Sequence, residues 1–194
     1  MKAVMYGAGN IGRGFIGMLL SESGYDVSFI DVNKEVIAAM NQERRYPVNI
    51  LYKNSSEEKW VENICCVDGS DENAVAEAIA EADIMATAVG VNILKFIAKP
   101  IAGGLRCRWE KDNKTPLNII ICENLIGADK VLKGMIADNL SESEKPLLDV
   151  LVGFVEASIG RMVPLQTPEM QRGNSLRVCV EAFDKLPLDK AAIK

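Results

Sequence analysis

The sequence predicts a doubly wound α/β fold, in which helices cover both faces of a mostly parallel β-sheet with an added antiparallel hairpin. Three observations predict it. Short apolar runs alternate with segments of helical periodicity from residue 2 to about residue 140. A glycine-rich turn follows the first run, and an acidic residue ends the second. Of the 194 residues, 48% are hydrophobic, so the chain can bury the core of one large domain over residues 1–194.

The first elements follow from apolar patterning and from helix boundary signals. In order, they are a strand over 2–6, a helix over 11–23 that Gly24 ends, a strand over 26–30 and a helix over 33–42. Two extended runs follow, over 46–52 and 60–67, and Asn54, Ser55 and Ser56 between them indicate a turn. These two runs predict the antiparallel hairpin.

The later elements continue the alternation. Asp71 is the predicted N-cap of a helix that runs to about Ala82. Pro100, with the pair Gly103 and Gly104, predicts a kink or a break in the helix that contains them. The segments expected here are a strand over 83–89, a helix over 92–106, a polar loop over 108–116, a strand over 117–122, helices over 128–140 and 142–151, and extended runs over 152–158 and 175–183 that complete the sheet.

The turn after the first strand reads Gly7-Ala8-Gly9-Asn10-Ile11-Gly12. Its place between a strand and a helix is typical of a dinucleotide-binding βαβ unit of the Rossmann type. Gly7 permits the tight turn, Gly9 lets the backbone approach a pyrophosphate, and Gly12 lets the helix pack close to the strand. Free N–H groups at the helix start would hold the pyrophosphate, so we predict that all six residues bind the cofactor. A turn that only packs the helix on the sheet is the alternative.

Asp31 ends the second strand and bears on which cofactor binds. Its carboxylate would accept hydrogen bonds from the hydroxyl groups of the adenosine ribose, and it would repel the 2′-phosphate of NADP. Neither Val32 nor Asn33 supplies a cation for such a phosphate. Lys34 is close, but we expect it on the solvent face of the next helix. These residues predict NAD rather than NADP.

The composition argues against several other functions. The net charge of −5 leaves no basic surplus to neutralise phosphates, so we expect no nucleic-acid partner. A membrane span needs about 18 consecutive apolar residues, and we expect none here. Because a strand is predicted from Lys2, we expect no signal peptide. The five cysteines form no C-x-x-C pair, which predicts reduced thiols and a cytoplasmic protein.

Histidine is absent from the chain. Since histidine is the commonest metal ligand and the commonest general base, we expect no zinc site and no Ser-His-Asp hydrolase.

Two further strand ends carry chemically suggestive residues, Thr87-Ala88-Val89-Gly90 and Cys122-Glu123-Asn124. Ligands of open parallel sheets bind outside the carboxyl ends of the strands, so Val89, Gly90 and Asn124 are candidate cofactor-binding residues. The Asn124 amide offers both a donor and an acceptor for a nicotinamide amide or a substrate oxygen. Alternatively, Glu123 and Asn124 only cap the next helix.

Recognisable sequence runs occur at 1–17, 87–90, 94–105, 116–120, 122–124, 153–155 and 161–164. Through these runs, nearly the whole chain resembles the polyol-specific long-chain dehydrogenases, that is, mannitol dehydrogenases and uronate reductases. The resemblance implies the NAD-binding domain of an oxidoreductase that, at full length, interconverts mannitol 1-phosphate and fructose 6-phosphate. Mannitol 2-dehydrogenase and fructuronate or tagaturonate reductase are the alternatives within the family.

The resemblance also implies residue roles. In the family, the counterpart of Asn124 lies at the reacting carbon and stabilises the developing alkoxide, so Asn124 is the catalytic candidate. The general base there is a lysine on a second, all-helical domain, accompanied by an asparagine and a histidine. The polar end at 189–194 looks like a linker, so we expect that domain and its lysine outside this chain. Neither Lys190 nor Lys194 is a substitute, and the chain alone should bind NAD without turnover.

Two features depart from the family pattern. Gly160 stands where the family has an acid before an arginine, here Arg161, which removes one contact to substrate hydroxyls. Arg172 and Arg177 lie in a divergent segment and either bind a phosphate or, as we expect, are exposed loop charges. From a different functional class, the chain could be a module that senses NADH and regulates a partner without hydride transfer.

Overall fold

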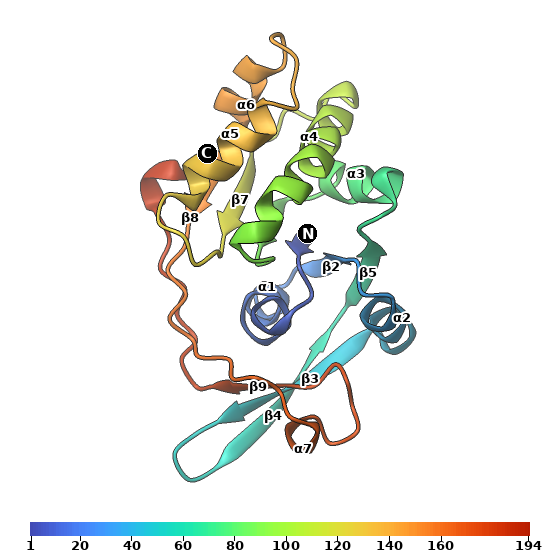
Figure 1. Ribbon diagram of the computed structural model, residues 1–194, viewed down its shortest axis with the longest axis vertical. Helices are drawn as coiled ribbons and strands as arrows, with labels where there is room; N and C mark the ends of the chain where they lie inside the picture. Colours follow the sequence, from blue (N-terminus) through green and yellow to red (C-terminus); the bar gives the residue numbers. More distant parts are fainter.

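The computed structural model describes residues 1–194 and contains two β-sheets (Figure 1). The larger sheet has six strands in the order β5-β2-β1-β6-β7-β8, and every neighbouring pair is parallel. Its strands are β1 (Lys2–Tyr6), β2 (Asp26–Asp31), β5 (Ile64–Asp68), β6 (Ile84–Thr87), β7 (Leu117–Ile121) and β8 (Val152–Glu156). The predicted parallel sheet is therefore confirmed.

Helices cover both faces of the larger sheet, as predicted (Figure 1). The helical segments of the chain are η1 (Gly12–Gly17, a π-helical segment) and its continuation α1 (Met18–Glu22), α2 (Lys34–Glu43), α3 (Glu72–Ala80), η2 (Val91–Ile93, a 3₁₀ turn), α4 (Leu94–Glu110), α5 (Ala128–Ala137), α6 (Lys145–Leu151), α7 (Pro168–Gln171) and η3 (Lys190–Ala192). Of these, α7 packs on β9 of the smaller sheet. Along β1, Ala3 and Met5 pack with η1, α1 and α2, whereas Val4 and Tyr6 pack with α3, α4 and α5. Each face of the sheet thus carries its own hydrophobic core.

The smaller sheet has the order β4-β3-β9 and packs on η1 (Figure 1). Its strands are β3 (Arg45–Leu51), β4 (Ser56–Glu62) and β9 (Val178–Glu181). The antiparallel pairing of β3 with β4 confirms the predicted hairpin. Two predictions here are wrong. The run 60–67 is not one strand, because Asn63 has a left-handed backbone (φ 56°) between β4 and β5. The run 175–183 does not complete the larger sheet, because β9 pairs with β3.

The sequence predicts a kink or a break in helix α4, and the structure shows no break, because the helix continues through Pro100. Tertiary packing accounts for this, because one side of the helix is buried on the larger sheet and on α3. Helices α3 and α4 approach each other so closely at Gly104 that a Cβ on this residue would lie 2.6 Å from the Ile79 Cβ of α3. Neither α4 nor any other helix combines the length and the apolar character needed to cross a membrane.

The predicted polar loop over 108–116 is wrong at its start, because Arg108 lies within α4 and is only 2% exposed. Its guanidinium donates to the carbonyl groups of Ala80 and Ala82 at 2.8 Å each, and to that of Thr115 at 3.0 Å. These carbonyls precede β6 and β7, so Arg108 binds backbone at the amino ends of the strands.

Two connections run side by side between the two sheets (Figure 1). The chain leaves β8 for the smaller sheet and returns after β9 to the edge of β8. An antiparallel bridge joins Ala157 to Leu188, and the Ser158 N–H donates to the Pro187 carbonyl at 3.0 Å. Residues 157–159 and 187–189, named the strap below, therefore lie together beside the carboxyl end of β8.

Candidate functional site

The chain changes its direction across the larger sheet at β1. It first moves outward to β2 and β5, then crosses to β6, β7 and β8 on the other side. Open α/β sheets bind ligands outside the carboxyl strand ends at such a point. Directly after β1, Gly7 has a φ of 103°, and a Cβ there would lie 2.5 Å from the Ala88 carbonyl oxygen. Only glycine therefore fits where the ends of β1 and β6 meet.

The turn after Gly7 presents free backbone N–H groups. The first helical hydrogen bond runs from the Arg13 N–H to the Gly9 carbonyl at 2.9 Å. The N–H groups of residues 9–12 have no carbonyl acceptor, as expected in the first turn of a helix. A Cβ on Gly9 would meet nothing within 4 Å, whereas one on Gly12 would overlap the Gly7 carbonyl oxygen. The turn therefore packs tightly on its inner side and leaves donors for an anion on its open side.

Asp31, at the end of β2, lies beside this turn. Its Oδ2 accepts a hydrogen bond from the Ala8 N–H at 2.7 Å. Its Oδ1 accepts from the N–H groups of Val32 and Asn33 at 2.8 and 2.9 Å. Each carboxylate oxygen has two lone pairs, so Oδ2 retains acceptor capacity for a hydroxyl group. The structure thus brings the predicted acid and the glycine turn together.

Lys34 begins α2 and is exposed, as the sequence predicts. Its ammonium group forms an ion pair with Asp68 at the end of β5. Hydrogen bonding from Lys34 holds the pKa of the Asp68 carboxyl well below its usual range. The lysine is therefore already engaged by a carboxylate.

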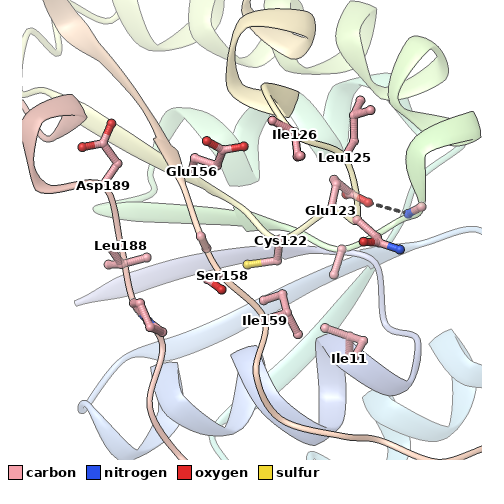
Figure 2. A pocket seen from close by; sticks show the side chains of 15 residues that line it. Ile11, Cys122, Glu123, Leu125, Ile126, Glu156, Ser158, Ile159, Leu188 and Asp189 are labelled. Atoms are coloured by element: carbon pink, nitrogen blue, oxygen red, sulfur yellow. Dashed lines mark hydrogen bonds between the residues drawn. The ribbon is translucent and has the colours of Figure 1, made fainter.

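A cavity of about 1260 Å³ lies along the carboxyl ends of β6, β7 and β8 (Figure 2). It is lined by Ile11, Ala88, Gly90, the segment 122–126, Glu156 and the strap. Figure 2 shows Ile11 and Ile159 together on the side of η1, while the carboxyl groups of Glu123, Glu156 and Asp189 lie around the opposite side. The cavity therefore combines an apolar wall that suits a flat ring with acceptors that suit hydroxyl groups.

Glu123 joins the ends of β6 and β7. It is 8% exposed, its Oε1 accepts from the Val89 N–H at 3.0 Å, and its Oε2 accepts from the Gly90 N–H at 2.8 Å (Figure 2). The cap alternative is wrong for Glu123, because α5 begins after Gly127 with no side-chain cap. Gly90 lines the cavity as a candidate residue should, but the N–H groups of Val89 and Gly90 are occupied by Glu123.

Asn124 follows Glu123 and is exposed at the cavity. It does not cap α5 either, so its amide is free to reach a ligand. Glu156, at the end of β8, also lines the cavity, and its Oε1 accepts from the Gly127 N–H at 2.8 Å. Sequence reasoning included Glu123 in the suggestive run 122–124 but missed its hydrogen bonds, and it missed Glu156 altogether. Their partners are 29 to 34 residues away, so no local pattern indicates them.

The cysteine nearest the candidate residues is a buried thiol. Cys122 lines the cavity, and burial raises the pKa of its thiol, to which the charge of Glu123 adds. It is therefore neutral near pH 7. All five cysteines are free thiols, and no cluster of three His, Cys, Asp or Glu side chains is placed to hold a metal ion.

Arg161 binds the protein itself rather than the cavity. Its guanidinium donates to the carbonyl of Phe183 and, at 3.0 Å, to that of Gly14, and it lies 5.0 Å from the centre of the Phe15 ring. At Gly160, a Cβ would lie 2.8 Å from the Phe183 Cε1 atom. The Phe183 ring thus occupies the space where an acid at position 160 would begin.

The two arginines of the divergent segment lie directly after α7 and directly before β9, not at the cavity. Arg172 is exposed after α7, as expected of a loop charge. Arg177 is not, because its side chain is largely buried and its Nη1 lies 2.5 Å from the Glu58 Oε2 atom of β4.

Comparison with known proteins agrees with this geometry. Residues 1–194 match the family described as the mannitol dehydrogenase Rossmann domain. The chain belongs to the mannitol dehydrogenase family. Both the resemblance carried by the sequence motifs and the Rossmann fold are thereby confirmed.

This mannitol dehydrogenase domain is similar to proteins about twice its length. It is 43% identical to the mannitol-1-phosphate 5-dehydrogenase of Lactococcus lactis subsp. lactis (strain IL1403) over 194 residues, which are 100% of this chain and 49% of that protein. It is 44% identical to the mannitol-1-phosphate 5-dehydrogenase of Geobacillus thermodenitrificans (strain NG80-2) over 184 residues, 94% of this chain and 46% of that protein. The chain therefore spans about half the length of the curated relatives it matches.

Solved structures share the fold. A substrate-free D-sorbitol dehydrogenase superposes with a TM-score of 0.84 at 13% identity, over 98% of this chain and 50% of that one. A Pseudomonas fluorescens mannitol 2-dehydrogenase, in a ternary complex with NAD and D-mannitol, gives a TM-score of 0.80 at 14% identity, over 98% of this chain and 49% of that one.

Proposed function

We propose that this chain is the NAD-binding half of a cytoplasmic mannitol-1-phosphate 5-dehydrogenase, which interconverts mannitol 1-phosphate and fructose 6-phosphate. The observation that carries the cofactor assignment is the row of N–H groups at residues 9–12 without carbonyl acceptors, beside Asp31. The relatives at 43% and 44% identity support the phosphorylated substrate. The mannitol 2-dehydrogenase that holds NAD and D-mannitol supports this class of ligands for the fold.

The residues of this chain suit the successive parts of a dinucleotide, from the adenosine ribose at the end of β2 to the nicotinamide ring in the cavity. The free N–H groups of Gly9 to Gly12 suit the diphosphate, and the Asp31 Oδ2 atom suits a ribose hydroxyl. Ile11 continues the turn into the cavity, where its apolar side chain suits a nicotinamide ring. Bound there, NAD supplies the hydride acceptor.

Asn124 is the proposed catalytic residue of this half. Its free amide at the cavity donates a hydrogen bond to the substrate oxygen that becomes an alkoxide, which in other enzymes contributes about 3–4 kcal/mol to the transition state. The lysine that removes the hydroxyl proton belongs, in this proposal, to a second domain outside the 194 residues. A polyol phosphate would then bind between the two domains.

Calorimetry with the 194-residue chain tests the cofactor assignment. We expect NAD or NADH to bind, NADP to bind more weakly, and mannitol 1-phosphate with NAD to give no turnover. The absence of heat with both nicotinamide nucleotides would overturn the assignment, whereas turnover by this chain alone would show that the base lies within it. Assays of a full-length enzyme with mannitol, mannitol 1-phosphate and fructuronate then distinguish the members of the family.

A further inference from the structure

Arg13 is a buried guanidinium directly after the glycine turn. Its side chain is 6% exposed, its Nη1 donates to the Ala8 carbonyl, and its Nε is buried without a hydrogen-bond partner. The nearby carboxylate of Asp31 accepts from three backbone N–H groups instead of pairing with it. A full positive charge thus lies under the turn with a carbonyl as its partner.

Such a charge is costly to bury without a paired anion. Burial lowers the pKa of the Arg13 guanidinium, although Tyr46 and Asp31 oppose that shift. Arginine nevertheless stays protonated in proteins, so the charge remains.

The hydrogen bond from Arg13 fixes the direction of one peptide. The chain has no cis peptide bonds, so the carbonyl of Ala8 and the N–H of Gly9 point in opposite directions across their shared peptide plane. Because Arg13 holds the carbonyl on the inner side, the Gly9 N–H points to the other side. This N–H has no carbonyl acceptor in the protein, and a Cβ on Gly9 would meet nothing within 4 Å, so the surroundings of Gly9 are open to a ligand.

The preceding peptide is fixed as well, because Asp31 accepts from the Ala8 N–H at 2.7 Å. Two charged side chains of opposite sign therefore hold consecutive peptides of the turn. Asp31 holds an N–H group, and Arg13 holds a carbonyl group.

We propose that Arg13 is a positioning residue of the dinucleotide site, which aims the Gly9 N–H at the diphosphate and places a positive charge behind that peptide. This inference rests on the proposed function. Arg13 does not touch the ligand in this arrangement, since its side chain is buried under the turn. Replacing Arg13 should therefore weaken the binding of ligands that carry a diphosphate and should change the binding of adenosine little.

A ligand series on the 194-residue chain tests this role. Calorimetry measures the affinities for NADH and ADP, and ligand-observed NMR measures the affinity for adenosine. Each measurement compares the wild-type chain with Arg13→Met and Arg13→Lys. Loss of a charge-assisted contact predicts that Arg13→Met binds NADH and ADP about tenfold or more weakly, while adenosine affinity stays within about twofold. Arg13→Lys keeps the charge and should restore part of the lost affinity.

Arg108→Met is the matched control. Arg108 is also buried on backbone carbonyls, but at the amino ends of β6 and β7, so its loss should lower stability and leave NADH affinity unchanged. Wild-type affinity of both Arg13 variants for NADH and ADP, or an equal loss for adenosine, would overturn the proposal alone. If the wild-type chain fails to bind NADH, both the proposed function and the positioning role of Arg13 are overturned. If Arg13→Met does not fold, Arg13→Lys decides alone: a loss of affinity confined to NADH and ADP supports the role, and wild-type affinity for both ligands overturns it.

Discussion

Carboxylates that hold backbone N–H groups determine the shape of the candidate site at the residue scale. Asp31 holds three such groups, Glu123 holds two and Glu156 holds one. Each connects a strand end to a turn that is close in space but 23 to 34 residues away in sequence. Removing one carboxylate therefore frees donors in the protein at the same time as it changes the ligand site.

Asp31→Ala should weaken NAD binding about tenfold or more, because a hydrogen bond from a ribose hydroxyl to a charged oxygen contributes about 1.5–3 kcal/mol. The affinity for NADP should fall less, since the repulsion between the Asp31 carboxylate and the 2′-phosphate of NADP disappears as well. The difference in affinity between the two cofactors therefore narrows, as measured by calorimetry. Asp31→Asn keeps one oxygen for the Ala8 N–H but turns an amide nitrogen toward the N–H groups of Val32 and Asn33, so urea unfolding of both variants separates a loss of stability from a loss of affinity. An unchanged NAD affinity in Asp31→Ala would contradict the role.

Glu123→Gln should destabilise the chain by about 1–3 kcal/mol, because the amide nitrogen would face an N–H group that needs an acceptor. Urea unfolding measures this loss. NADH affinity should fall too, since the Val89–Gly90 turn would lose its attachment to β7. Glu142→Gln is a control with the same chemical change on an 89% exposed side chain. Equal stability of the two variants would contradict the bridging role of Glu123.

At the scale of elements, local patterns predicted what depends on neighbours in sequence. The strands of the larger sheet, the glycine turn and the Asp71 cap follow from apolar runs and short spacings, and the structure contains them. The rest depends on contacts between distant segments. No pattern near residue 178 indicates that β9 pairs with β3, and Pro100 is tolerated because packing on α3 and on the sheet outweighs local preference. The Glu123 contacts were missed for the same reason.

Two adjacent glycines of α4 should respond in opposite directions to alanine. At Gly103 a Cβ would meet nothing within 4 Å, so Gly103→Ala should stabilise by about 0.5–1 kcal/mol through helix propensity. At Gly104 a Cβ would lie 2.6 Å from the Ile79 Cβ, so Gly104→Ala should destabilise by about 1–3 kcal/mol through overpacking. Urea denaturation compares the two, and a gain in stability for Gly104→Ala would refute the close contact of α3 with α4.

The start of α6 should be sensitive to acid. Hydrogen bonding from Arg106 of α4 lowers the pKa of Glu144 to about 2. Because this folded pKa lies below the unfolded value of about 4.3, the ion pair contributes stability above that value and loses it as the pH falls toward 2. The difference in unfolding free energy between wild type and Glu144→Gln should be largest near pH 7 and shrink steadily below about pH 5. A difference independent of pH would contradict this ion pair.

At the scale of the whole molecule, the two sheets share one hydrophobic core. Residues of β3 and β9 pack with Phe15 of η1 and with Met5 and Phe29 of the larger sheet. The smaller sheet is therefore part of the same folding unit as the Rossmann sheet, although it lies at one end of the molecule in Figure 1.

The two tryptophans can test this shared core. Trp60 lies on β4 of the smaller sheet, and Trp109 lies on α4. We expect Trp60→Phe and Trp109→Phe, each reporting through its remaining tryptophan, to show urea transitions that coincide with the far-ultraviolet circular dichroism of the same variant. A separate, earlier transition reported by Trp60 would mean that the hairpin unfolds by itself. Saturating NADH should move both transitions together, by about 2.7 kcal/mol at a hundredfold excess over Kd.

The double attachment of Asp31 has a consequence for engineering a preference for NADP. Truncating the side chain to remove its negative charge would also deprive the Ala8 N–H of its acceptor and loosen the glycine turn. A successful redesign must therefore exchange the carboxylate for a short neutral acceptor, as in Asp31→Ser, and introduce a cation separately. Val32 is the natural place for it, because this side chain is 70% exposed and Val32→Arg would disturb no packing in the core.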